Sequence, residues 1–503
     1  MPLKKVLIVT VLLNASFALV ANETDEPSAK DILNNVFKTY FQDAPISNFG
    51  GNSISFDYST NYMYQGYELS REMPFSNRPG ITTFHLDFDN QSLTEHSYYR
   101  YLQGLYGTLL VNKQGQSQRV NLALNEYQNR AQPFDDLLTQ HAMLQPIWLL
   151  KVLSDSSVDI NANKLQINHE ELTYRLCLSH LILKEICLNI DKQNHYILSA
   201  TQTIRSTTMR FLYRNHIRAN GKLTPTYIVK SREKSAYPAV FIYAVKVVND
   251  DLSELSHLSL PKQLKEAKKS DTMDGQIRVQ QLSDTVTWIT KNAAVSLFVE
   301  FSDYILLVDA FDRGLEERIG VFKSISDKPI KRVSISHHHH DHIRALPNLL
   351  AGGIQLVTTS PILQYVSETF DLNKDQTTNA LVVNNRLTLS DETQKVTMYE
   401  LTEMQHAKNM MLTYIHKEQL VYLPDHYEEM YLRENKHAII QLLQFLEREK
   451  LPVSGFIQGH GNDLYSTEFI KKEMTKTNYI DALPRDLGQE VKDINTALHY
   501  LQQ

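Results

Sequence analysis

The chain has 503 residues, 42% of them hydrophobic and 21% charged, and its formal net charge is −6. This composition is that of a globular protein and excludes an intrinsically disordered one. The length predicts two or more domains, because single hydrophobic cores rarely grow beyond about 250–300 residues. The negative charge argues against a nucleic-acid-binding protein, since no basic excess is present to displace phosphate counterions.

Residues 1–21 are predicted to be a secretory signal peptide. Lys4 and Lys5 precede the apolar run 6–13, and small residues follow, with cleavage expected after Ala18 or Ala21. The run is shorter than a membrane span requires, and no other stretch is long and apolar enough. We therefore expect a periplasmic or secreted protein without a transmembrane span in the mature chain. An uncleaved N-terminal anchor is the alternative.

Residues 22–269 are predicted to form a β-rich domain with covering helices. One helix is expected from Ser28 to about Phe41, where apolar residues recur at helical spacing, and another over 133–153. Strands are expected between 53 and 124, with polar breaks at 76–80 and 113–118. Further strands are expected at 172–178, 186–190, 197–209, 226–229 and 239–247, with a hairpin turn at Asn220-Gly221.

The order of these elements is helix, strands, helix, strands, behind a predicted export signal. In this order the region resembles the lipoprotein-carrier half-barrel of the bacterial periplasm. The resemblance implies a curved sheet with the helices against one face. The aromatic residues of the strands are equally consistent with an ordinary core.

The two cysteines of the chain, Cys177 and Cys187, fall on neighbouring predicted strands. In an oxidising compartment they are candidates for a disulfide, and two free thiols are the alternative. Neither lies near the histidine cluster described next, so neither is expected to bind a metal.

Residues 249–275 have the composition of a linker. Pro261 is followed by a polar, charged run, and the hydrophobic pattern changes afterwards. We place a domain boundary near Ser270, so that a second domain spans residues 270–503.

The second domain contains the sequence VSISHHHHDH at 333–342. A β-prone run here precedes the spacing H-x-H-x-D-H, which is carried by His337, His339, Asp341 and His342. On an extended loop the two alternate histidines share one side, so both imidazoles can reach one metal ion, with Asp341 and His342 beside a second. A solvated, histidine-rich tract is the alternative, but the apolar residues that frame the motif disfavour it. A helix is expected directly after the motif, over 343–350, with Gly352-Gly353 as its C-terminal stop.

Three more candidate ligands stand beside or at the ends of predicted strands. His406 lies between predicted strands 396–401 and 410–415, Asp425 ends the apolar run QLVYLPD, and His460 stands in a Gly-His-Gly turn. Glycines on both sides of His460 let the backbone approach closely. Imidazole nitrogen and carboxylate oxygen together suit zinc.

These residues, in this order, resemble the metallo-β-lactamase superfamily over about 273–503. The resemblance implies an α+β fold, namely a four-layer αββα sandwich with the ligands at strand ends. It also implies two zinc ions, or other divalent transition metals. One site would use His337, His339 and His406, and the other Asp341, His342 and His460, with Asp425 bridging both.

Other histidines near the motif are not expected to bind metal. His338 and His340 alternate with the ligands and should face away, into the second shell or solvent, and His416 and His426 are left as non-ligands. Two positions depart from the family pattern. Arg344 and Ala345 stand where small residues are common, and Pro424 stands where glycine is common before the bridging aspartate.

The resemblance predicts a metal-dependent hydrolase. A pair of zinc ions lowers the pKa of a shared water from ~15.7 to about 7, so metal-bound hydroxide attacks the substrate while Asp341 orients the water as the catalytic residue. The bridging aspartate favours esters, lactones or thioesters over β-lactams as substrates, and the substrate is expected to be a small molecule, apolar or acyl-bearing. A β-lactamase and a non-catalytic periplasmic protein that binds metal or lipid are the alternatives.

Overall fold

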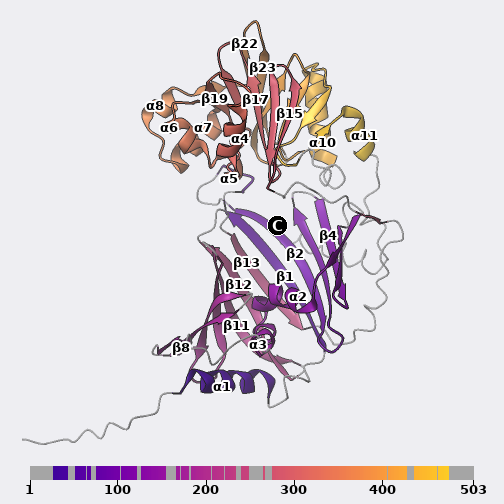
Figure 1. Cartoon of the computed structure of the whole chain (residues 1–503), viewed down its shortest axis with the longest axis vertical. Helices are drawn as coiled ribbons and strands as arrows, with labels where there is room; N and C mark the ends of the chain where they lie inside the picture. Colours follow the sequence, from indigo (N-terminus) through magenta and orange to yellow (C-terminus); the bar gives the residue numbers. More distant parts are fainter. Residues whose placement is uncertain are drawn as a thin grey trace, which may run out of the picture.

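Figure 1 shows the computed structural model of the chain, which is built mainly from three β-sheets. It describes residues 27–42, 51–63, 65–69, 75–101, 104–121, 126–154, 166–169, 172–180, 183–204, 207–219, 221–233, 239–247, 264–266, 275–404, 406–426, 436–461 and 463–474. The predicted signal peptide and most of the predicted linker lie outside these ranges. Among the described residues, no helix has both the length and the hydropathy that crossing a membrane requires.

The first sheet has 14 strands within the described residues. One meander, β1 to β6, and a second, β7 to β13, join where β1 pairs antiparallel with β13, and the two-residue β14 adds a parallel edge beside β6. The sheet curves around the helices (Figure 1). Its strands are β1 Gly51–Met63, β2 Phe75–Asp87, β3 Ser92–Tyr101, β4 Gly104–Lys113, β5 Gln116–Asn121, β6 Glu126–Ala131, β7 Gln166–His169, β8 Thr173–His180, β9 Lys184–Asp191, β10 Ile197–Ile204, β11 Thr207–Ala219, β12 Lys222–Glu233, β13 Ala239–Val247 and β14 Lys265–Glu266.

Two predictions for this sheet are wrong. The polar segment 76–80 is not a break but part of β2, where its backbone pairs with residues 58–62 of β1, because ladder hydrogen bonds do not require apolar side chains. The single strand predicted over 197–209 is two antiparallel strands, β10 and β11. The predicted hairpin joins β11 and β12, which pair as far as Ala219 and Lys222, and Gly221 has a φ of +73°; Asn220 lies outside the described residues. The likeness to a lipoprotein carrier stays a prediction.

Three helices pack against this sheet and share its core: α1 Ala29–Phe41, α2 Phe134–His141 and α3 Pro146–Ser154. Ser28 begins α1 with a capping box to Asp31, as predicted. The helix predicted over 133–153 is interrupted by a 3₁₀ turn at 142–144. Pro146, which has no backbone N–H to continue a helix, instead begins α3.

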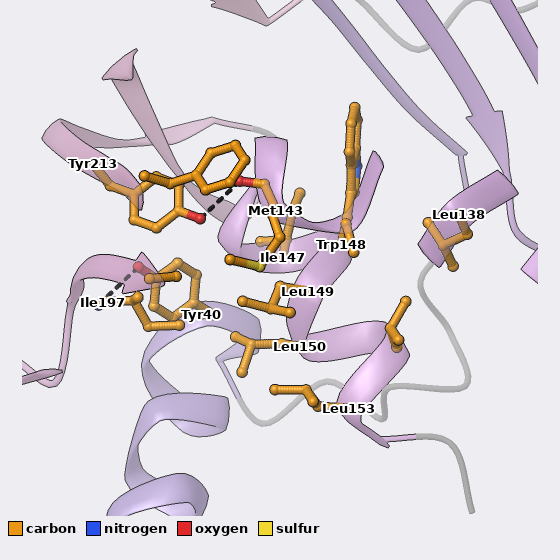
Figure 2. Packing of buried hydrophobic residues seen from close by; sticks show 14 of the residues in the cluster. Tyr40, Leu138, Met143, Ile147, Trp148, Leu149, Leu150, Leu153, Ile197 and Tyr213 are labelled. Atoms are coloured by element: carbon orange, nitrogen blue, oxygen red, sulfur yellow. Dashed lines mark hydrogen bonds between the residues drawn. The ribbon is translucent and has the colours of Figure 1, made fainter. Parts of the chain in front are cut away.

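Figure 2 shows that core from close by, with the fully buried Trp148 of α3. Two tyrosine hydroxyls tie the helices to the strands. The Tyr213 hydroxyl donates to the carbonyl of Met143 at 2.8 Å, and the Tyr40 hydroxyl accepts from the N–H of Ile197 at 3.1 Å. Because both polar groups are satisfied, the aromatic rings are buried without an unpaired hydroxyl.

Cys177 on β8 and Cys187 on β9 face each other across the ladder and are joined in a disulfide. The predicted bond is therefore present, and the open alternative of two free thiols is wrong.

Removing this disulfide should destabilise the first sheet. The two cysteines are ten positions apart along the chain. In the chain-entropy model a loop of this size contributes about 2–3 kcal/mol, by restricting the unfolded state. The C177S/C187S variant should therefore unfold at lower denaturant concentration than the oxidised wild type. Reduced wild type should match the variant. Two thiols titrated in the unfolded, unreduced wild type would contradict the bond.

The other two sheets lie face to face. The seven-stranded sheet comprises β15 Ile277–Ser283, β16 Val286–Lys291, β17 Ala294–Glu300, β18 Ile305–Val308, β19 Ile330–Ser334, β20 Gln355–Thr359 and β21 Leu381–Val383. The six-stranded sheet comprises β22 Arg386–Ser390, β23 Lys395–Thr402, β24 Asn409–Ile415, β25 Leu420–Tyr422, β26 Gly455–Ile457 and β27 Leu464–Tyr465.

Alternating side chains place each sheet between two cores. Leu297 of β17 and Met398 of β23 belong to the core between the sheets, while Phe298 and Tyr399, the next residues, face outward. The helices α4 Leu315–Phe322, α6 Leu346–Ala351 and α7 Ser360–Thr369 cover one outer face. The helices α10 Lys436–Arg448 and α11 Thr467–Met474 cover the other. The order of layers is helix, sheet, sheet, helix.

One helix prediction in this region is wrong. The helix predicted over 343–350 is two short helices, α5 His340–Ile343 and α6. Pro347, near the start of α6, cannot donate the backbone hydrogen bond that would continue α5.

Candidate metal centre

The histidine-rich loop leaves the end of β19, and its neighbours come from the facing sheet. His406 lies between β23 and β24, Asp425 follows β25 and His460 follows β26. The two sheets meet at this edge. The N–H of Met411 donates to the carbonyl of Ser336 at 2.6 Å, and Ala294 forms a β-bridge with His460. Strand ends from both sheets therefore converge on one place.

The structure brings all seven predicted ligands together in two groups. One contains His337, His339, His406 and Asp425, all buried, and the other contains Asp341, His342 and His460. Within each group, one nitrogen or oxygen per residue lies within 4.8 Å of the others. The solvated-tract alternative is wrong, since His337 and His339 are 0% and 2% exposed.

The first group has the spacing of a tetrahedral metal site. His406 Nε2 lies 2.9 Å from His339 Nδ1 and 3.1 Å from Asp425 Oδ2, which is 3.4 Å from His337 Nε2. Ligands about 2.0–2.1 Å from a tetrahedral zinc ion stand about 3.3 Å from one another. The buried Nε2 of His337 has no hydrogen-bond partner in the described part of the chain. These donors fit a zinc ion.

Asp425 also reaches the second group. Its Oδ2 lies 3.2 Å from His342 Nε2, and its Oδ1 lies 3.1 Å from His460 Nε2. His460 Nε2 is in turn 3.6 Å from Asp341 Oδ2. The two oxygens of one buried carboxylate thus face both groups, which is the geometry that a ligand bridging two ions requires.

Close packing at the end of β26 makes this approach possible. A Cβ at Gly459 would lie 2.5 Å from the Cβ of Pro424 and 3.4 Å from His342 Cε1. Any larger residue would push the His460 turn away from Asp425. The glycine that the sequence suggested for close approach is needed here, and Pro424, the departure from the family pattern, is its neighbour.

Burial and repulsion between neighbouring imidazoles favour the neutral forms of His337 and His339. Burial, followed by the neighbouring imidazoles, holds the pKa values of His337 and His339 well below their usual range. Burial opposes ionisation of Asp425, but His460, His406 and His342 outweigh it and hold the pKa of this carboxyl well below its usual range. Neutral imidazoles and an ionised carboxylate are the forms that bind metal.

His342 has the opposite electrostatics. Burial disfavours its protonated form, but the carboxylates of Asp309, Asp341 and Asp425 outweigh burial and raise the pKa of His342 well above its usual range. A metal ion at His342 Nε2 therefore displaces a proton, and metal affinity should fall as the pH falls.

Asp309, directly after β18, contacts the candidate centre, and the sequence had not pointed to it as a site residue. It is fully buried, and its Oδ2 accepts hydrogen bonds from His342 Nδ1 at 2.7 Å, Ser336 Oγ at 2.7 Å and the Tyr422 hydroxyl at 2.9 Å. The bond from Nδ1 fixes the His342 tautomer and leaves Nε2 for the centre. Its position as the last residue of the apolar run YILLVD (304–309) was the available signal.

The histidines predicted to be non-ligands stay outside both groups. His338 is buried, with Nε2 2.9 Å from the carbonyl of Gly66, so it faces away from the ligands but not into solvent. His426 Nδ1 lies 3.3 Å from the Pro424 carbonyl, and burial lowers its pKa to about 3. His416 Nε2 lies 2.8 Å from the Thr397 hydroxyl, and His340 is half-buried in α5.

Comparisons with known proteins match less than half of the chain. No family model matches the sequence, and no curated protein does. A metallo-beta-lactamase from Pontibacter korlensis is similar at 14% identity, covering 40% of this chain and 98% of that chain, with a TM-score of 0.32. Rubredoxin oxygen:oxidoreductase from Desulfovibrio gigas is similar at 17% identity, covering 39% and 61%, with a TM-score of 0.33. A flavo di-iron protein from Thermotoga maritima is similar at 13% identity, covering 40% and 60%, with a TM-score of 0.32. Likenesses at these scores do not decide the function, which must be judged from the metal-ligand geometry.

Proposed function

We propose that the chain is an exported di-zinc hydrolase of the metallo-β-lactamase type. Its catalytic domain would span residues 270–503, after a β-rich domain of residues 22–269. The observation that carries the proposal is the pair of ligand groups that share the Asp425 carboxylate. Buried side chains of this kind are rarely brought together without an ion, because neutral imidazoles and a carboxylate lose hydration on burial.

Each side chain has a proposed role. His337 Nε2, His339 Nδ1 and His406 Nε2 would hold one ion, and Asp341, His342 and His460 the other, with Asp425 bridging. The Phe311 ring, whose centroid lies 4.1 Å from that of His342 and 4.6 Å from that of His460, would exclude water from one side of the second group. Excluding water there would lower the local dielectric constant and so strengthen the electrostatic interactions inside the centre.

Two zinc ions, when bound, would lower the pKa of a shared water to about 7 and polarise an electrophilic carbonyl. Asp341 lies at the rim, with its Oδ2 directed toward His460. From there its carboxylate would orient the attacking water and accept its proton. Asp425, shared by the two ligand groups, would hold them at a fixed distance from each other. The reaction we propose is cleavage of an ester, lactone, thioester or similar bond.

The test is metal content followed by turnover. The purified full chain should carry two zinc ions and hydrolyse at least one member of a panel of chromogenic esters, lactones, thioesters, phosphodiesters and a β-lactam. Chelation should abolish the activity, and added zinc should restore it. Turnover that persists in zinc-free protein would refute the metal role. Two tightly bound ions without turnover on any class would favour the non-catalytic binding protein.

We further propose a small apolar or acyl-bearing substrate, which the N-terminal region could hold. A cavity of about 570 Å³ lies there, between the curved sheet and α2. Its aromatic lining includes Phe56, Phe84, Phe211, Phe241 and Tyr243, and Lys230 Nζ stands 4.7 Å from the centre of the Phe241 ring. Arg78 and the carboxylate Glu95 also line the cavity, and aromatic rings beside two cations suit an apolar chain that carries an anionic end.

The lysine in this cavity predicts a pH dependence of stability. Burial lowers the pKa of Lys230 from 10.5 to about 8. Because the lysine binds its proton more tightly in the unfolded chain, the buried charge lowers the free energy of unfolding. This destabilisation is complete below pH 8 and disappears as the pH rises toward about 10.5. Lys230→Met should raise the free energy of unfolding at pH 7 by about 1–3 kcal/mol.

Chemical denaturation of Lys230→Met and wild type at pH 7 and pH 10 measures this effect. The gain should shrink at the higher pH, whereas Lys113→Met, at an exposed lysine of β4, should show neither gain nor pH dependence. An equal effect of both substitutions would contradict the buried-charge explanation.

A further inference from the structure

We infer that the metal centre is completed by a loop of the N-terminal region, residues 65–69, in which Gln65 is a positioning residue for Asp341. This inference rests on the proposed function, because it concerns the same centre. The loop connects β1 and β2 of the 14-stranded sheet, and it lies more than 260 residues before the histidine motif in sequence.

Gln65 fixes the orientation of a candidate ligand. Its Nε2 donates to Asp341 Oδ1 at 2.8 Å, while Oδ2 of the same carboxylate faces His460 Nε2 at 3.6 Å. One oxygen is therefore held by the loop and the other is directed to the second ligand group. Without the amide donor, the carboxylate could rotate about its side chain and its Oδ2 would lose this direction.

Gly66 acts on the first group in the same way. Its buried carbonyl lies 3.0 Å from His339 Nε2 and 2.9 Å from His338 Nε2. A proton on His339 Nε2 that is donated to this carbonyl leaves Nδ1 unprotonated, and Nδ1 is the atom beside His406 Nε2. The loop thus holds one ligand of each group through an outer hydrogen bond.

Further contacts anchor the loop to both sides of the centre. The N–H of Lys408, two residues after His406, donates to the carbonyl of Tyr67 at 3.0 Å. Leu69 packs against the core beneath α4, α6 and α7. The Lys408 ammonium and the Glu68 carboxylate form an ion pair at 3.2 Å. Both partners of this pair are exposed, so it should contribute little.

The hydrogen bonds from the Gly66 carbonyl to His339 and from Gln65 to Asp341 differ from this exposed ion pair, because each of them orients a candidate metal ligand. Groups that orient a metal ligand change metal affinity or activity by about 10–100-fold when they are removed. A contact that only held the loop in place would change the free energy of unfolding, but it would not change the affinity for one ion more than for the other. The proposal therefore predicts a selective effect on the ion held by Asp341, His342 and His460.

The test uses the full chain with Gln65→Met, which keeps the side-chain volume but removes the donor. Both zinc dissociation constants are measured by competition with a chromogenic chelator, and the cobalt-substituted protein is examined by visible absorption. We expect one of the two dissociation constants to rise by about 10–100-fold, with a changed cobalt spectrum, while the other stays as in the wild type. Gln65→Ala should behave likewise, and the matched control Glu68→Ala, in the same loop, should bind both ions as wild type does.

Wild-type affinities and an unchanged cobalt spectrum in Gln65→Met would overturn the inference, as would an equal loss at both sites. These outcomes differ from failure of the proposed function. In that case the wild type itself would bind no zinc, or would bind two ions without catalysing any hydrolysis.

Discussion

Replacing Asp425 with asparagine is expected to leave fewer than two zinc ions per chain and to lower kcat/KM by more than about 100-fold. Removing a hydrogen bond to a metal ligand already lowers metal affinity or activity by about 10–100-fold, so removing a ligand that both ions share should lower them further. The carboxylate lies 3.1–3.4 Å from nitrogens of His337, His406, His342 and His460, so it contacts members of both groups. Its negative charge is needed to balance two divalent ions.

Asparagine is the informative replacement because Asp425 has a φ of +62°. Asparagine tolerates this left-handed conformation better than alanine does, so backbone strain should not confuse the result. Zinc is measured by elemental analysis of the dialysed protein, and turnover on whichever panel substrate the wild type cleaves. Asp303→Asn, at an exposed carboxylate that pairs with Lys331, is the control and should retain both ions. Two ions and full turnover in Asp425→Asn would remove the bridging role.

The second large effect is expected at Asp309. Asp309→Asn should lower the free energy of unfolding by about 3–5 kcal/mol, which is the usual cost of breaking a buried charged pair from one side. Its Oδ2 accepts from His342, Ser336 and Tyr422 at once, and a neutral amide cannot accept all three bonds. Zinc affinity should also fall by about 10–100-fold, because the His342 tautomer is no longer fixed.

Chemical denaturation in chelator separates the effect of Asp309 on stability from its effect on zinc. Tyr422→Phe removes only one of the three donors and should cost about 1 kcal/mol, with little change in zinc binding. If Asp309→Asn and Tyr422→Phe had the same small effect on the free energy of unfolding and on zinc affinity, Asp309 would not be the carboxylate that orients His342.

Much of the candidate site could be read from the sequence because its signals are local. The H-x-H-x-D-H spacing needs only an extended loop to put His337 and His339 on one side. Asp425 and His460 follow short apolar runs that can only be buried strands, and strands of facing sheets end at a common edge. All seven residues lie in the two groups, as the resemblance to the metallo-β-lactamase superfamily implied, and metal binding by them stays a prediction. For the two cysteines, the sequence left a disulfide and two free thiols open, and the structure shows the disulfide.

Some predictions of helices and strands were wrong because the pattern of apolar residues alone does not decide where an element begins or ends. Two predicted helices are broken near Pro146 and Pro347, where a missing N–H outweighs the helical spacing of the apolar residues. The polar segment 76–80 forms a strand because its partner in β1 supplies the hydrogen bonds. His338 is buried only because another part of the chain covers it.

The sequence by itself determined the ligand types, their spacing and the strands that carry them, since these depend on neighbouring residues and on the alternation of apolar side chains. Only the tertiary structure decided which groups hold the ligands in place. Gln65 and Gly66 are 276 and 273 residues from Asp341 and His339. A single glutamine and a backbone carbonyl have no spacing or periodicity that could reveal such a contact, because it exists only where residues 65–69 meet the histidine-rich loop after β19.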